Sequence, residues 1–265
     1  MVGWGSPDAA APLLPDHGAM TTTHEIADGV YRISTCVPDV APGGFTFNQY
    51  LLDGDEPLLF HTGPRALFPA VSEAVARVLP VERLRWITFG HVEADECGAM
   101  NQWLGAAPMA EVTFNPLGCD VSLNDMADRP PRPWVEDEAL DTGGHELMVI
   151  PTPHVPHGWE AQVLFDRTTA TLFCGDLLSQ TGDPPALVHD RDVVSPALEA
   201  EGVFRATCLT AATAPVVAGL ADLEPRTLAI MHGPAYAGDC AAALNGLADG
   251  YAGLFEASQD RGMVR

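Results

Sequence analysis

Four short apolar runs, each leading to a histidine or a carboxylate, constrain this chain more than any other feature of its sequence. These runs are LRWITFG, ELMVIPT, TLFCG and TLAIM. The first such residues after them are His91, His154, Asp176 and His232. Because a rigid scaffold positions the loops that follow strands, side chains from several strand ends can converge on one site. Histidine and carboxylate side chains bind metals, so the pattern predicts a metal site at the edge of a sheet.

Three carboxylates follow His91 within five residues, at Glu93, Asp95 and Glu96. In extended chain His91 and Glu93 point the same way, and Asp95 is expected to face a second ion. Three histidines with three or four carboxylates, divided over two ions, form an oxygen-rich ligand set that suits redox-active iron. Zinc prefers four nitrogen or sulfur ligands, so we expect two iron ions, with zinc or manganese as the alternative.

The hydrophobic pattern predicts alternating strands and helices, which is typical of an α/β protein. Residues 29–63 are predicted to form strands with a hairpin at 53–55, and the apolar spacing over 65–79 predicts a helix. We expect 115–145 to be a long loop. Two sheet-rich halves, each followed by helices, predict a four-layer sandwich with a cleft between two sheets. Further strands are expected at 84–90, 111–114, 146–152, 160–166, 169–176 and 227–231, and further helices near 100–104, 196–210, 214–222 and 238–258.

Composition narrows the classes of function. The chain has 36 acidic and 13 basic residues and a formal charge of −23, so we expect it to bind neither nucleic acid nor an anionic membrane surface. No apolar run reaches the roughly 18 residues of a membrane span. The six cysteines show no pairing pattern and the first residues lack a basic start. We therefore expect a cytoplasmic protein with a flexible N-terminal arm at 1–22 and a single domain at 23–265.

The ordered motifs resemble the metallo-β-lactamase superfold. Its hydrolytic branch carries HxHxDH in the first loop, whereas its diiron branch carries HxExDH. Residues 91–96 are HVEADE, so Glu93 matches the branch of the flavodiiron oxygen and nitric oxide reductases and their stand-alone oxygen-binding relatives. The segments PHVPHGW, LFCGDL and MHGP are similar to that family's later motifs. The resemblance covers most of residues 25–258 and implies an α/β fold, the metallo-β-lactamase-like four-layer αββα sandwich.

Carried over residue by residue, the resemblance implies that one iron is bound by His91, Glu93 and His154. It implies that a second iron is bound by Asp95 and His232, and that Asp176 bridges the two. The resemblance also implies oxygen or nitric oxide as the small ligand, an external flavoprotein or rubredoxin as electron donor, and a homo-oligomer. Because the sequence stops at residue 265, we expect no FMN-binding flavodoxin domain in the chain.

Two positions depart from the family pattern. Glu96 stands where the family has the second-iron histidine, and His61 stands where the fold has the aspartate of a DTG segment. Glu96 can still ligate the second ion, or that site is weakened or empty. We expect His61 and His157 to hydrogen-bond the ligands, with His157 as a substitute ligand in the alternative. Three other histidines, His24, His145 and His189, lie in polar surroundings and are expected to be solvated.

The leading hypothesis is therefore a dinuclear non-haem iron protein that binds or reduces oxygen or nitric oxide. The alternative is a hydrolase that uses zinc or manganese to activate water against an ester, lactone or thioester. A third reading is a binding protein whose second metal site has decayed. Glu93 favours the first hypothesis, whereas Glu96 leaves the second open.

Overall fold

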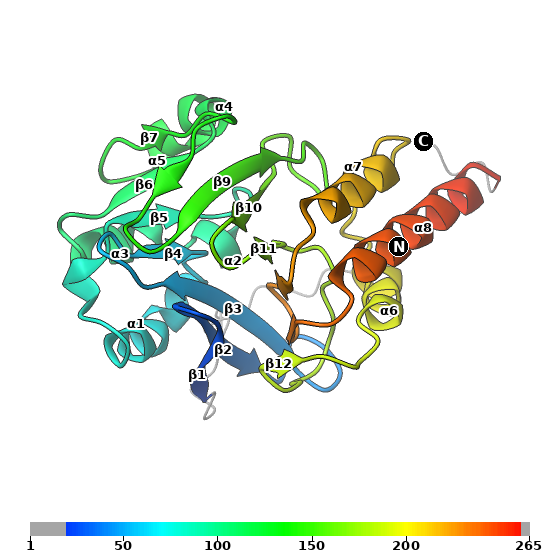
Figure 1. Cartoon of the computed structure of the whole chain (residues 1–265), viewed down its shortest axis with the longest axis horizontal. Helices are drawn as coiled ribbons and strands as arrows, with labels where there is room; N and C mark the ends of the chain where they lie inside the picture. Colours follow the sequence, from blue (N-terminus) through cyan, green and yellow to red (C-terminus); the bar gives the residue numbers. More distant parts are fainter. Residues whose placement is uncertain (1–19, 261–265) are drawn as a thin grey trace, which may run out of the picture.

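Residues 20–260 are described by the computed structural model and contain two seven-stranded sheets (Figure 1). The first has the order β1-β2-β3-β4-β5-β6-β7 and the second β12-β14-β13-β11-β10-β9-β8. The strands of the first sheet are β1 (Thr21–Ala27), β2 (Val30–Val37), β3 (Phe45–Leu52), β4 (Leu58–Phe60), β5 (Trp86–Thr88), β6 (Glu111–Phe114) and β7 (Arg132–Pro133). Those of the second are β8 (Leu140–Asp141), β9 (Glu146–Pro151), β10 (Gln162–Asp166), β11 (Thr171–Phe173), β12 (Leu187–Val188), β13 (Thr227–Ala229) and β14 (Ala235–Tyr236).

Helices cover the outer faces of both sheets. In Figure 1, α6, α7 and α8 lie together at one end of the view and α1 and α3 near the other. The α-helices are α1 (Phe68–Ala76), α2 (Ala94–Cys97), α3 (Met100–Ala106), α4 (Pro116–Gly118), α5 (Asn124–Met126), α6 (Val194–Phe204), α7 (Thr213–Gly219) and α8 (Cys240–Asp260). Four shorter helical turns are η1 (Arg65–Leu67), η2 (Val81–Arg83), η3 (Cys119–Leu123) and η4 (Leu220–Leu223).

Three apolar clusters define the layers. One packs α1 and α3 against the first sheet, one packs α6, α7 and α8 against the second, and the third lies between the sheets. Side chains alternate between clusters along each strand, because successive residues of a strand point to opposite faces. Leu59 of β4 faces α1 and α3, whereas Phe60 faces the other sheet. Likewise Leu172 of β11 faces the second helix layer and Phe173 faces inward.

The α/β four-layer sandwich predicted from the sequence is confirmed, and so are most of its elements. The 53–55 hairpin connects β3 and β4, which pair antiparallel. Residues 115–145 differ from the expected loop, because short helices and the two-residue strands β7 and β8 occupy much of this segment. The first strand begins at Thr21, inside the 1–22 range of the expected arm, and the rest of that arm at 1–19 lies outside the described residues.

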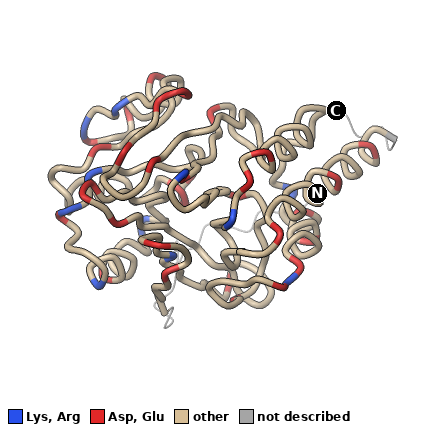
Figure 2. Tube along the Cα trace, in the orientation of Figure 1, with Lys and Arg blue, Asp and Glu red and all other residues tan. Residues whose placement is uncertain are grey.

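Acidic residues outnumber basic ones across the fold, and Figure 2 shows them on the sheet loops and on the helices alike. None of the helices within 20–260 has the length and apolar character that a membrane crossing needs.

Phe173 packs within the apolar layer between the two sheets, and its removal should destabilise the protein. Its ring centroid lies 5.5 Å from that of Tyr50 and 5.3 Å from that of Phe60, and its side chain is fully buried. Phe173→Ala should lower the free energy of unfolding by about 3–5 kcal/mol, because it leaves a cavity between the sheets. Urea denaturation measures this change. Met109→Ala is the control, since Met109 is 70% exposed, and a similar loss in both variants would contradict the prediction.

Candidate metal centre

Parallel strand pairs in the two sheets bring the predicted residues to one edge. In the first sheet β4 and β5 run parallel, and the loop after β5 carries His91 and Glu93 before α2 begins. In the second sheet β11 and β13 run parallel, and Asp176 and His232 follow them. Hydrogen bonds from Cys174 N to Ala229 O (2.9 Å) and from Met231 N to Gly175 O (3.2 Å) keep these two chain segments together beyond the strands.

Backbone hydrogen bonds between the sheets fix this edge. Gln162 N donates to Gly90 O at 2.8 Å, next to His91. Asn48 N donates to Met231 O at 3.1 Å, next to His232. Residues from opposite sheets are therefore held at a fixed separation before any metal binds.

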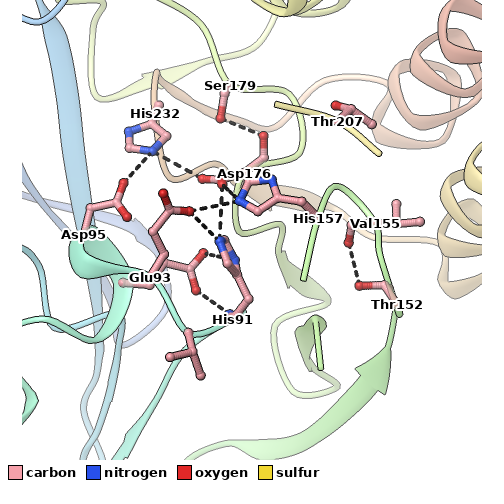
Figure 3. Close-up of polar contacts among 12 residues, drawn as sticks. His91, Glu93, Asp95, Thr152, Val155, His157, Asp176, Ser179, Thr207 and His232 are labelled. Carbon is pink, nitrogen blue, oxygen red and sulfur yellow. Dashed lines mark hydrogen bonds and ion pairs between the residues drawn. The ribbon is translucent and has the colours of Figure 1, made fainter. Parts of the chain in front are cut away.

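Four side chains make a first group of metal-ligating atoms: His91, Glu93, His157 and Asp176. One ligand atom from each lies within 4.8 Å of the other three. Glu93 Oε2 is 2.8 Å from His91 Nε2 and 2.9 Å from His157 Nε2. Asp176 Oδ2 lies 3.8 Å from His91 Nε2 and 3.6 Å from His157 Nε2. Figure 3 shows these side chains converging from three separate loops.

Asp176 also belongs to a second group, with Asp95 and His232. His232 Nε2 lies 3.2 Å from Asp176 Oδ1 and 3.3 Å from Asp95 Oδ2 (Figure 3). His232 Nδ1 donates to the carbonyl oxygen of Thr46 at 2.7 Å, so Nε2 is the nitrogen that faces the carboxylates. Each oxygen of the Asp176 carboxylate thus faces a different group, which is the arrangement that a bridging ligand needs.

The histidine of the 152–160 loop that reaches this centre is His157, not His154. His154 is exposed and lies outside both groups, whereas His157 is 28% exposed at its side chain and contacts Glu93. The backbone decides between the two, because His154 and Gly158 both have positive φ angles (64° and 83°) and the loop turns between them. His157 therefore takes the place among the ligating side chains that the resemblance assigns to His154, and His154 does not reach the centre.

Glu96 and His61 lie behind the first group. Both side chains are completely buried, and Glu96 Oε1 is 3.4 Å from His61 Nε2 and 3.1 Å from His91 Nδ1. Among the described residues, the ion pairs of Glu96 are with these two histidines. The Glu96 carboxylate therefore has no ion pair in the second group of Asp95, Asp176 and His232, where the sequence predicts it as a possible fourth carboxylate ligand.

Neighbouring groups of opposite charge shift the pKa values of His91, His232 and Glu93. Burial lowers the pKa of His91, but Glu96, Glu93 and Asp176 outweigh it and raise this pKa to about 11. Burial is likewise outweighed at His232, where Asp176 and Asp95 raise the pKa to about 10. Hydrogen bonds from His157 and His91 hold the pKa of Glu93 well below its ordinary value.

The residues of this centre fit a pair of cations. Asp176 Oδ1 is buried and has no hydrogen-bond partner of good geometry, although His232 Nε2 lies 3.2 Å away, so this oxygen is available to a metal. No arginine among the described residues pairs with Glu93, Asp95 or Asp176. Oxygen and imidazole ligands suit iron, manganese or zinc.

A cavity of about 170 Å³ opens beside the ligands. One wall consists of Glu93, Asp95, Asp176, His157 and His232. The rest of the lining is largely apolar and includes Phe45, Ala197, Ala200, Phe204 and Tyr251. Sequence reasoning does not find this apolar lining, because α6 and α8 are identified only as helices and nothing in their spacing marks the face toward the site.

His145 is a further difference from the sequence-based expectation. It is buried, and its Nδ1 lies 2.8 Å from Asp166 Oδ2 on β10. His24 and His189 are exposed, as expected.

A sequence profile described as ODP family beta lactamase matches residues 45–233, a segment that includes every side chain of both ligand groups. The chain belongs to the ODP beta-lactamase family. The predicted resemblance to the metallo-β-lactamase superfold is therefore confirmed.

The sequence relatives of this chain are named as flavoproteins. The type A flavoprotein fprA of Rhodobacter capsulatus is 27% identical over 187 residues, which cover 64% of this chain and 42% of that protein. Five such relatives match, and the chain spans only 26–42% of their lengths.

Solved structures show the same core fold. The rubredoxin oxygen:oxidoreductase of Desulfovibrio gigas has a TM-score of 0.74 at 17% identity, over 89% of this chain and 62% of that one. A metal-soaked flavodiiron core from Synechocystis has a TM-score of 0.72 at 22% identity, over 91% of this chain and 62% of that one.

The two histidines of the 152–160 loop give a matched pair of variants. We predict that His157→Ala weakens zinc binding by more than the roughly 10–100-fold cost of losing an outer partner, because it removes a ligand. His154→Ala should bind zinc as the wild type does, because His154 is exposed and outside both groups. Competition with a chromophoric chelator measures both. Stronger dependence on His154 would contradict this assignment.

Metal uptake should release protons. At about pH 8, below the pKa values of about 11 and 10, His91 and His232 are protonated in the metal-free protein. Metal binding requires neutral imidazoles, so it should displace about one proton from each and become tighter as pH rises. Calorimetry in buffers of different ionisation enthalpy measures the number released. A binding enthalpy that is independent of the buffer would contradict this expectation.

Proposed function

We propose that this chain is a non-haem diiron protein that binds or reduces oxygen or nitric oxide. The observation that carries the proposal is the Asp176 carboxylate, whose two oxygens face separate groups of histidine and carboxylate ligands. Two cations on either side of one carboxylate give a small ligand the chance to contact both.

The ligand chemistry favours iron. Three carboxylates and three histidines over two positions form an oxygen-rich set, in keeping with the preference of iron for mixed oxygen and imidazole ligands. Glu93 supports this choice, since a histidine at the same position would favour zinc.

The cavity supports a small neutral ligand. Apolar side chains, including Phe45 and Phe204, line it together with the carboxylates. An uncharged diatomic molecule loses little on leaving water for such a lining, so the cavity suits a small neutral ligand.

Relatives support the same chemistry. The Desulfovibrio gigas protein is named for rubredoxin and oxygen, and it shares the core fold. By analogy, we propose that an external flavoprotein or rubredoxin supplies electrons here and that the protein acts as a homo-oligomer.

In this proposal bound ferrous ions supply the electrons and the open coordination positions for the diatomic ligand. Asp176 holds the two metal positions together, and Glu93 and Asp95 balance the positive charge. His232 is kept in one orientation by its hydrogen bond to the Thr46 carbonyl. Phe45 stacks on the His232 ring at a centroid distance of 4.2 Å and keeps water from that side of the imidazole.

The test is to purify the full chain without oxygen, load it with ferrous iron and record absorbance while oxygen or nitric oxide is added. We expect an absorbance change that saturates near one diatomic molecule per two irons. Asp176→Asn should abolish it, because the shared carboxylate would lose its charge. Met109→Ala, which lies outside the site, should behave as wild type.

Two results would overturn the proposal. One is iron-loaded protein whose spectrum does not respond to either gas. The other is protein that retains zinc or manganese in place of iron and hydrolyses a model ester or lactone, which would support a metal-dependent hydrolase instead.

A further inference from the structure

Glu96 is the one carboxylate of the 91–96 segment that turns away from the centre. It lies on α2, and its side chain is completely buried on the far side of the His91 ring from Glu93. A buried carboxylate must be compensated by hydrogen bonds or opposite charge, so its partners show what it is doing there.

The partners of Glu96 are one metal-facing histidine and one buried histidine behind it. Oε2 accepts a hydrogen bond from His91 N at 2.6 Å, and Oε1 lies 3.1 Å from His91 Nδ1. His61 Nε2 approaches the same Oε1 at 3.4 Å. Glu96 therefore contacts His91 at both the backbone and the ring.

The chain around Glu96 is built to hold it in this position. The carbonyl oxygen of Glu96 accepts hydrogen bonds from Thr62 N (2.6 Å) and Thr62 Oγ1 (3.0 Å), which tie α2 to the His61 segment. A Cβ at Gly90 would lie 3.0 Å from Glu96 Oε2 and 3.1 Å from Oε1. The carboxylate fits because position 90 has no side chain.

The two ring nitrogens of His91 face different groups: Nδ1 faces Glu96 behind the ring, and Nε2 faces Glu93 and Asp176. When Nε2 binds a metal, the remaining ring proton is on Nδ1, where Glu96 Oε1 can accept it. Nε2, at the other end of the ring, lies 2.8 Å from Glu93 Oε2 within the first ligand group. A carboxylate that binds the far nitrogen of a metal-binding histidine orients the ring and increases its basicity.

We propose that Glu96 is a positioning residue and not a metal ligand, and that together with His61 it fixes His91 with Nε2 toward the first metal position. This inference rests on the metal binding proposed above. It leaves the second position with Asp95, His232 and the shared Asp176 as its protein ligands, against four at the first. The first position therefore binds its ion more tightly than the second.

The direct test needs no substitution. In zinc-loaded protein labelled with ¹⁵N-histidine, long-range ¹H–¹⁵N correlation spectra distinguish the two ring tautomers. We expect His91 to carry its proton on Nδ1 and to bind zinc through Nε2. The opposite tautomer, or a metal-bound Nδ1, would overturn the proposal.

Variants test the role of the carboxylate. Glu96→Gln should weaken the first zinc by about 10–100-fold, the usual cost of losing an outer-shell partner, without reducing the number of zinc ions at saturation. His61→Gln should also weaken the first zinc in the wild-type background but add little in the Glu96→Gln background, because it acts through Glu96. If Glu96 were a ligand, its loss would instead remove the second zinc and leave the affinity for the first unchanged.

Glu160→Gln is the matched control. Glu160 is also a buried carboxylate against the same loop, and its Oε1 accepts from Val92 N at 3.0 Å, but none of its hydrogen bonds is to a metal-facing side chain. It should bind the first zinc as wild type does. An equal loss in Glu160→Gln and Glu96→Gln would show a general effect on the loop and would overturn the proposal.

The outcomes separate this inference from the proposed function. Zinc binding that follows the pattern above, in a protein that takes up no iron, would reject the diiron function and retain the role of Glu96. If the wild type binds no metal, the metal-free protein still tests the contact. A slowly exchanging His91 Nδ1 proton in the wild type supports it, and the absence of that proton overturns it.

Discussion

The fixed separation of the two sheets at one edge is the constraint on which the metal centre depends. His91 and Glu93 come from the first sheet, whereas Asp176 and His232 come from the second. The backbone hydrogen bonds from Gln162 to Gly90 and from Asn48 to Met231 join these segments directly. The inner apolar layer, centred on residues such as Phe173, supports the same spacing. The ligands are therefore preorganised by the fold, and metal binding need not assemble them.

This preorganisation has an electrostatic consequence. Bringing three carboxylates together without an arginine among them is unfavourable unless cations are present. In the metal-free protein, protonated histidines fill that role, which is why the pKa values of His91 and His232 are raised. Metal ions and protons thus compete for the same negative site. The arrangement explains how a strongly acidic chain folds around an acidic centre and still remains able to bind metal.

Much of the site could be predicted from the sequence because strand ends locate side chains well. The residues after β5, β11 and β13 converge as expected, since parallel neighbours end at the same edge of a sheet. The choice between His154 and His157 could not be predicted, because positive φ angles in a short loop, and not a repeating pattern, decide which imidazole turns inward. The orientation of the Glu96 side chain could not be predicted for a similar reason. Its partner His61 is distant in sequence, and the space that the Glu96 carboxylate occupies depends on Gly90. The apolar cavity wall escaped prediction because it forms only when α6 and α8 pack on the second sheet.

The proposed diiron function requires Asp176 to lie between two iron ions. Crystals of anaerobically iron-loaded protein, measured on both sides of the iron absorption edge, show whether it does. We predict two anomalous peaks, one among His91, Glu93 and His157 and one beside Asp95 and His232, with an oxygen of Asp176 on each. A single peak, or peaks at which Asp176 contacts only one ion, would contradict it.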